Sequence, residues 1–330
     1  MKNINKNRIS FKSVVDSLLV PRVLSGAVLL LFAAGSMASA QTRSYGELRA
    51  EHPDWLQVPG ALARPDCVHQ IPSGATVDTT SDKKGDDVIL NGKVIAHYDR
   101  CPEQAIDTRH VAQDPGTGNG WVEAAQWDTA LKSGDNIDFL YGYWTVPSAP
   151  ENDGALIFLF NGVEPSPSGW IMQPVLQYGD NGHFGGDYWV LASWLVHSNT
   201  DFYVSTPINV NPGDTIEGAL WQTASGKTLG YRVDASDQTT GQNSTLKLTS
   251  TGYQWIWAYA GVLEAYRVTS CSQFPSGSDG VASFVETHVY HGYPKSELLS
   301  NKFYSAKYNY GGPSCNFNVE ISGGSATLQF

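Results

Sequence analysis

The sequence predicts an all-β protein whose main part is an antiparallel two-sheet β-sandwich, with a small N-terminal α+β or β unit ahead of it. Two observations carry this prediction: short runs of β-type residues recur with turn residues between them, and no segment shows a strong helical period. The expected strands of the sandwich are residues 155–160, 170–176, 188–195, 202–210, 215–222, 229–233, 244–248 and 254–267. Nine of the ten tryptophans lie between Trp121 and Trp257, and this concentration indicates that the large core is in the same region.

The first 40 residues predict an export signal that is removed near Ala40. Five basic side chains, from Lys2 to Arg22, precede an apolar stretch at 23–34, and Ala38-Ser39-Ala40 supplies the small-x-small cleavage pattern. The apolar stretch is too short to span a bilayer comfortably, and no second apolar run of about 18 residues follows it. We therefore expect a secreted protein, extracellular or periplasmic, without stable membrane insertion.

The rest of the chain divides into three expected parts. Residues 41–115 form an N-terminal propeptide or accessory unit, in which residues 45–56 favour a short helix and residues 87–96 favour a hairpin with an Asn-Gly turn. Residues 116–270 form the β-sandwich domain, where catalysis is expected, and residues 271–330 form a disulfide-tied extension that completes the sandwich. About 150 residues are enough for one such core.

The net charge disfavours one class of partner. Without residues 1–40 the chain carries 16 basic and 31 acidic side chains, a net charge of −15. A surface of this sign disfavours binding to nucleic acid, and the one dense basic segment is the part that is expected to be removed. Nothing in the sequence indicates an oligomer, so we expect a monomer.

Four cysteines, Cys67, Cys101, Cys271 and Cys315, remain in the exported chain. An even number in an oxidising compartment predicts two disulfides, and four cysteines allow three pairings. Pairing of Cys67 with Cys101 and of Cys271 with Cys315 is favoured because each bond closes a local loop. No CxxC spacing is present, so a zinc site built on cysteine is not expected.

One acid, Glu264, interrupts the apolar and aromatic run QWIWAYAGVLEAYR. Strict alternation of side chains along a strand predicts that Glu264 shares a face with Ala258 and Tyr266. An ionised acid on an apolar face costs free energy unless a partner satisfies it. Glu264 is therefore either a paired structural residue or a group whose perturbed proton affinity is used in function.

A set of short phrases in a fixed order is more specific than any one of them alone. They are Asn119–Ala124, Tyr143–Pro150, Gly169–Trp170, Val175–Gly179, Asp187–Trp189, Ser193–Trp194, Val210–Ile216 and Ala260–Tyr266. In their order and spacing the chain resembles the glutamic endopeptidases called eqolisins, and more distantly the neprosin peptidases, which share a concanavalin-like sandwich fold. The resemblance covers roughly residues 119–267.

Members of that family hydrolyse peptides with a catalytic Glu and Gln that face each other across the concave side of the sandwich. Carried over residue by residue, the resemblance implies that Glu264 and Gln177 are this pair. A carboxylate can take a proton from water and later give it to the leaving amine, while a neutral amide donates a hydrogen bond to the oxyanion. The resemblance implies a protein or peptide substrate, and neither role needs a metal or a cofactor.

Other residues could contribute to such a site. Alternation brings Gln173 to the same face as Gln177, so Gln173 is a rival for the amide role. Trp144, Trp189 and Trp194 are expected to line a groove for an extended peptide. The alternative function is a secreted β-sandwich module that binds carbohydrate or another ligand without catalysis, in which these aromatic side chains stack on sugars.

The chain departs from the family at two positions. Ser193 stands where eqolisins usually carry an acid, and Ala265 stands where an acid commonly follows the catalytic Glu. Loss of nearby carboxylates changes the proton affinity of Glu264, and with it the pH optimum or the activity itself. Neprosins use two glutamates; Glu164 is the nearest candidate for a second acid, but it precedes a Pro-Ser-Pro-Ser loop.

Overall fold

The structure, a computed structural model, describes residues 43–81, 84–102, 105–109, 114, 116–166, 169–197, 200–275 and 280–330. The export signal expected at residues 1–40 lies outside these ranges. Within them, no helix is long and apolar enough to cross a membrane.

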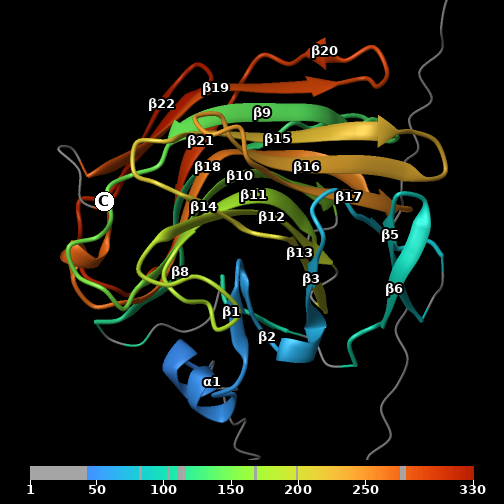
Figure 1. Cartoon of the computed structure of the whole chain (residues 1–330). Coiled ribbons are helices and arrows are strands. Elements are labelled where there is room, and N and C mark those ends of the chain that lie inside the picture. Colours follow the sequence, from blue (N-terminus) through green and yellow to red (C-terminus); the bar gives the residue numbers. More distant parts are fainter. Residues whose placement is uncertain are drawn as a thin grey trace, which may run out of the picture. The chain divides into compact units, whose positions relative to one another are not determined.

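Two large β-sheets lie face to face and form a sandwich, as Figure 1 shows. The first sheet contains, in spatial order, β21 (Tyr304–Lys307), β8 (Gly118–Asp128), β18 (Gln254–Val268), β10 (Leu156–Ser166), β11 (Ile171–Tyr178), β12 (Trp189–His197), β13 (Asp201–Ser205) and β3 (Val68–Ile71), with β14 (Ile208–Val210) beside β12. The second sheet contains β22 (Asn318–Ser322), β23 (Ser325–Gln329), β19 (Val281–His291), β9 (Ile137–Thr145), β15 (Thr215–Ala224), β16 (Leu229–Asp237), β17 (Asn243–Ser250), β4 (Thr76–Asp78), β5 (Gly85–Leu90) and β6 (Lys93–Asp99), with β20 (Glu297–Leu298) beside β19. Strand pairs between residues 118 and 329 of the described chain are antiparallel, so the predicted all-β, two-sheet antiparallel sandwich is confirmed.

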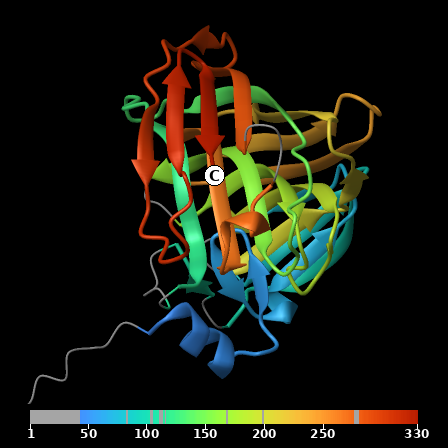
Figure 2. The same ribbon diagram turned by 90° about the vertical axis from the view of Figure 1, so that its left-hand side faces the viewer.

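The N-terminal segment adds strands to both sheets and covers one of them. β3 pairs in parallel with β13, and β4 pairs in parallel with β17. A small sheet of β1 (Leu56–Val58), β2 (Ala61–Ala63) and β7 (Ile106–Asp107) follows the helix α1 (Tyr45–Glu51). α1, β1 and β2 lie at the face of the first sheet that points away from the second sheet, which we call its outer face (Figure 1, Figure 2). Their buried side chains belong to one apolar cluster with side chains of that face.

Local signals in the sequence account for α1 and for the hairpin of β5 and β6. The Ser44 hydroxyl accepts a hydrogen bond from the Glu47 N–H, and the Glu47 carboxylate accepts one from the Ser44 N–H, which is a capping box. Asn91 (φ 52°) and Gly92 (φ 74°) form the turn of the hairpin, where a type I′ turn needs positive φ at both central residues. The predicted helix and hairpin are confirmed, although the helix ends earlier than expected.

Both faces of the first sheet are buried. Its inner face packs against the second sheet and includes Leu176 and Trp189. Its outer face includes Phe158 and Phe160, which belong to the same apolar cluster as Val58 of β1. Every residue of β11 and β12 is buried, and this is why their sequences read as nearly continuous apolar runs.

A β-bulge interrupts the alternation of side chains along β18. The register of its pairing with β8 shifts between Tyr259 and Gly261, because a bulge inserts one extra residue into one strand. Ala258 consequently packs between the two sheets, whereas Tyr259 lies on the outer face. Strict alternation is therefore wrong for Ala258 and correct for Glu264 and Tyr266, which follow the bulge.

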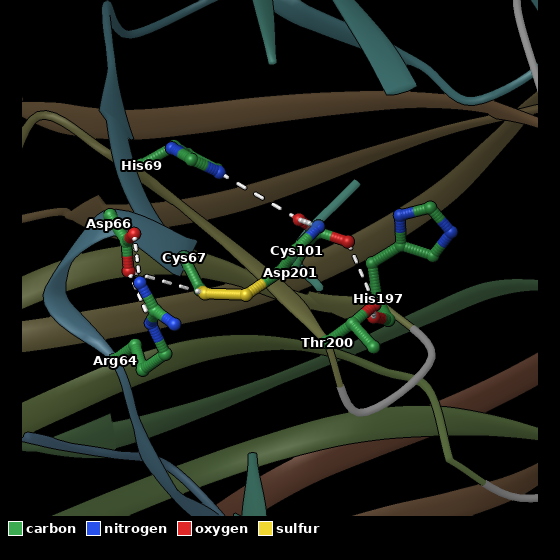
Figure 3. The surroundings of a disulfide bond; sticks show 8 residues. All are labelled: Arg64, Asp66, Cys67, His69, Cys101, His197, Thr200 and Asp201. Atoms are coloured by element: carbon green, nitrogen blue, oxygen red, sulfur yellow. Dashed lines mark hydrogen bonds and ion pairs between the residues drawn. A yellow bond between two sulfur atoms is a disulfide. The ribbon is translucent and has the colours of Figure 1, made fainter. Parts of the chain in front are cut away.

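Both predicted disulfide pairings are confirmed. Cys67 is bonded to Cys101, and Cys271 is bonded to Cys315. Figure 3 shows the first bond beside Asp201 of β13, whose Oδ1 accepts a hydrogen bond from the Cys101 N–H at 3.0 Å. This disulfide therefore lies where the N-terminal segment meets the edge of the first sheet.

Candidate active site

Glu264 lies on β18 with its side chain fully buried on the outer face of the first sheet. Its Oε1 accepts hydrogen bonds from the Gly60 N–H, at 2.7 Å, and from the Tyr266 hydroxyl. Its Oε2 has no hydrogen-bond partner among the described residues. Burial raises the pKa of Glu264 to about 7, even though both hydrogen bonds favour the charged form. Glu264 is thus an acid that changes its charge near neutral pH.

Gln177 lies in the same cross-strand row as Glu264. Phe158 on β10 is paired with Gln177 on one side and with Glu264 on the other. Paired residues project from the same face, so the Cα atoms of Gln177 and Glu264 are about 10 Å apart at the usual strand spacing. The Gln177 amide is engaged elsewhere: Nε2 donates to two carbonyl oxygens in the turn at 179–184, at 2.9 and 3.0 Å, and Oε1 accepts from Asn181 at 3.2 Å.

Gln173, the rival for the amide role, is buried on the same face. Neither of its amide atoms has a hydrogen-bond partner among the described residues. Gln173 and Glu264 line one cavity of about 20 Å³, together with Gly60, Arg109 and Trp121. That volume holds about one water. The cavity therefore combines a free carboxylate oxygen, a free amide and room for a water.

The three tryptophans expected to line a groove are buried. Trp144 and Trp189 lie between the two sheets, each 1% exposed, and so away from the face that carries Glu264. Trp194 lies on the outer face but is fully buried, and its ring centre is 5.8 Å from that of Phe184. Of the three, only Trp194 shares a face with the candidate catalytic residues.

The turn between β1 and β2 covers Glu264. Gly60 sits there at φ 78°, a conformation that favours glycine, and its N–H points to the carboxylate. The Gly60 carbonyl accepts from the Thr108 N–H at 3.0 Å, and the Thr108 hydroxyl lies 2.6 Å from the Tyr266 hydroxyl. Because Tyr266 donates its hydrogen to Glu264, Thr108 is the donor to Tyr266. No local pattern predicts Gly60 as a partner, since it is 204 residues from Glu264.

A second cavity, of about 360 Å³, adjoins the first and shares Arg109 and Trp121 with it. We call it the Glu164 groove; it is lined by Asp107, Arg109, Trp121, Gln126, Glu164, Trp257, Tyr259 and Tyr308. Glu164 is 5% exposed; its Oε1 accepts from Arg109 at 3.0 Å and its Oε2 from the Tyr259 hydroxyl at 2.9 Å. Burial raises the pKa of Glu164, and the Arg109 charge opposes this effect.

One cluster has the residue types of a metal site. Asp86, His197 and Asp201 bring their ligand atoms within 4.8 Å of one another. His197 Nδ1 is 2.7 Å from Asp86, and Arg100 donates to His197 Nε2 at 3.1 Å and to Asp86 at 3.3 Å. The Arg100 guanidinium supplies the positive charge that a cation would bring, so these contacts favour an ion-pair network that joins β5 to β12.

Comparisons with known proteins give structural neighbours alone. No family model matches the chain, and no curated protein matches it. The chain is similar to scytalido-glutamic peptidase with a transition state analog inhibitor, at 15% identity and a TM-score of 0.44 over 65% of this chain and 99% of that one. It is similar to SCP-B, a member of the eqolisin family of peptidases in a complex with the tripeptide Ala-Ile-His, at 16% identity and a TM-score of 0.41 over 65% of this chain and 98% of that one. Aspergilloglutamic peptidase from Aspergillus niger has 15% identity and a TM-score of 0.30 over 53% and 98% of the two chains. Likeness at this level assigns neither family nor activity, so the function is argued from the site.

Proposed function

We propose that this chain is a secreted endopeptidase of the glutamic type, which hydrolyses peptide bonds with a water activated by Glu264 and without a metal or cofactor. The observation that carries the proposal is the shared cavity: Glu264 and Gln173 line space for about one water. Glu264 Oε2 and the Gln173 amide have no hydrogen-bond partner among the described residues. A general base must lie within hydrogen-bond reach of the proton that it removes, and we propose that a water in this cavity takes that position beside Glu264.

The proposed reaction needs one acid and one amide. The ionised Glu264 takes a proton from the water while the water oxygen attacks the carbonyl carbon of the peptide. A glutamine N–H donates to the oxyanion of the tetrahedral intermediate. The protonated Glu264 then gives its proton to the leaving nitrogen as the C–N bond breaks, so the products are a carboxylic acid and an amine, and Glu264 is ionised again.

Two glutamines compete for the oxyanion role. The resemblance in sequence favours Gln177, which lies two strands from Glu264 on the same face. The cavity favours Gln173, whose amide makes no hydrogen bond to the described residues, whereas Gln177 would first have to leave the turn at 179–184. The Gln173→Ala and Gln177→Ala variants separate these assignments, because loss of an oxyanion donor lowers kcat by about 100-fold to 1,000-fold.

We further propose that the N-terminal segment is a propeptide that keeps this site latent. The Gly60 N–H donates a hydrogen bond to the Glu264 carboxylate, and Pro59 and Ala61 line the cavity beside it. In this arrangement the segment blocks the approach of a substrate to the water. Removal of the segment would expose Glu264 to solvent and lower its pKa from about 7 toward the ordinary range, because burial is the largest cause of the shift. An exposed Glu264 could then act as a base in mildly acidic medium.

The alternative is a secreted β-sandwich module that binds carbohydrate or another ligand. The burial of Trp144, Trp189 and Trp194 removes the rings that were expected to stack on a sugar. The observation that still favours a module is the Glu164 groove, whose walls include the rings of Trp257 and Tyr308.

Casein cleavage tests the proposal. The purified chain is incubated from about pH 3 to pH 7, and both casein fragments and loss of the N-terminal segment are followed. Glu123→Gln is the matched control, because Glu123 is also a fully buried acid but lies on the opposite face, paired with Leu263. We expect cleavage by the wild type and by Glu123→Gln, and none by Glu264→Gln. Equal cleavage by all three would rule out the assignment of Glu264, and the absence of both processing and cleavage would favour the binding module.

A further inference from the structure

The Glu164 groove contains a buried acid that the proposed reaction does not use. Most of its walls come from the sandwich, with Trp121 from β8, Glu164 from β10, and Trp257 and Tyr259 from β18. Asp107 and Arg109 of the N-terminal segment complete the lining. The groove adjoins the cavity of Glu264 on the same face of the first sheet, since Trp121 lines both. A group bound in the groove would therefore lie beside the proposed reaction centre.

Glu164 needs a positively charged partner. Glu164 is 5% exposed, and a buried carboxylate without a counterion costs several kcal/mol. Tyr259 satisfies Oε2 with a neutral hydroxyl, at 2.9 Å. The charge is balanced by Arg109, whose Nη1 is 3.0 Å from Oε1.

Arg109 fits the groove as a ligand would. Its guanidinium lies 5.9 Å from the centre of the Trp121 ring, within the range of a cation–π contact. Its other nitrogens donate to Asp107, which belongs to the same N-terminal segment. Arg109 and Asp107 thus come from the segment proposed to be removed, while Glu164, Trp121 and Tyr259 belong to the sandwich.

We propose that the Glu164 groove is a subsite for an arginine side chain of the substrate, and that Arg109 occupies it in the latent chain as a substrate would. This inference rests on the proposed peptidase function for its substrate class. When the segment leaves, Glu164 loses its counterion while the aromatic wall and the Tyr259 hydroxyl remain. An arginine side chain restores the charge, the hydrogen bond to Oε1 and the ring contact together, and its planar donors suit both a carboxylate and an aromatic face. One segment then covers both places. Its Gly60 N–H donates to Glu264 at the reaction centre, and its Arg109 guanidinium donates to Glu164 in the neighbouring subsite.

The first experiment measures binding and does not depend on peptidase activity. Arg109→Ala in the full chain removes the guanidinium from Glu164, and N-acetyl-arginine amide is titrated against this variant by calorimetry. N-acetyl-citrulline amide has the same length without the charge and is the matched probe. We expect the arginine probe to bind Arg109→Ala at least tenfold more tightly than the citrulline probe, because a charged donor makes a stronger hydrogen bond to a carboxylate than a neutral donor does. It should bind neither the wild type, in which Arg109 already pairs with Glu164, nor the Arg109→Ala/Glu164→Gln variant. Equal binding of the two probes, or no binding to folded Arg109→Ala, would overturn the subsite.

The second experiment uses the enzyme recovered after acid processing, so it holds even where Arg109→Ala fails to fold. Paired peptides that carry arginine or citrulline at successive positions around the cleaved bond are compared by kcat/KM. We expect one position at which arginine is preferred at least tenfold, a preference that falls below threefold in Glu164→Gln and persists in Glu123→Gln. Casein cleavage without any arginine preference contradicts the subsite and leaves the peptidase intact. Binding of the arginine probe without casein cleavage contradicts the peptidase and leaves the site for arginine intact.

Discussion

Replacing Glu264 with glutamine should stabilise the protein relative to the wild type at pH 8 but not at pH 4. Burial raises the pKa of Glu264 in the folded chain to about 7, against an ordinary value of 4.5. Between these values the folded state holds a proton that the unfolded state has lost, so the stability of the wild type falls as the pH rises. At 1.36 kcal/mol for each pKa unit, the gap corresponds to about 3 kcal/mol by pH 8. Glutamine keeps an oxygen for Gly60 and Tyr266 and does not ionise, so it avoids this loss.

Urea unfolding at pH 4, 6 and 8, followed by circular dichroism with the disulfides intact, measures the effect. The difference in unfolding free energy between Glu264→Gln and the wild type should change by about 3 kcal/mol, in favour of the variant, from pH 4 to pH 8. Burial raises the pKa of Glu123 to about 8. The unfolding free energy of Glu123→Gln should therefore also rise relative to that of the wild type as the pH increases, and this rise should continue to higher pH than for Glu264→Gln. Parallel curves for Glu264→Gln and the wild type would refute the argument that burial perturbs Glu264.

Three further predictions concern stability. Burial lowers the pKa of His197 below its ordinary value of about 6.5, so the wild type should lose stability as the pH falls through and below that value. In the same urea assay, His197→Gln should lose less unfolding free energy than the wild type between pH 7 and pH 5. Replacing Cys271 and Cys315 by serine should lower the unfolding free energy by up to about 4 kcal/mol, from the loop entropy of a 44-residue separation; a loss under 1 kcal/mol would contradict this. Phe158→Ala should cost about 3–5 kcal/mol in thermal or urea unfolding, because the ring is fully buried; a change within 1 kcal/mol would show that the outer face is not packed as described.

The class of fold followed from the sequence because strand periodicity and turns are local signals. Seven of the expected strand segments correspond to single strands, but the segment at 202–210 is divided into β13 and β14. β8 and β19 were not predicted as strands. The bulge after Tyr259 was also missed, because it depends on how β18 pairs with β8 and not on the composition of β18.

The candidate site was predictable only in part. Glu264 stands out in the sequence as an acid within an apolar strand, and the structure gives it the burial that this position requires. Gly60 and Arg109 have no such signal, since they reach the site from the N-terminal segment through long-range contacts. Trp144 and Trp189 were expected in a groove but lie in the core between the sheets. Aromatic residues occur in both cores and binding clefts, so the sequence alone does not distinguish the two locations.

The activation of water by Glu264 is tested most directly by the rate of hydrolysis of one defined peptide. Glu264→Gln and Glu123→Gln are processed in trans by immobilised wild-type enzyme, so that all proteins lack the N-terminal segment to the same degree, and kcat is measured at acidic pH. We predict that Glu264→Gln lowers kcat by about 100-fold to 10,000-fold, while Glu123→Gln stays within threefold of the wild type. A Glu264→Gln variant that retains kcat within tenfold of the wild type would contradict a catalytic role for Glu264.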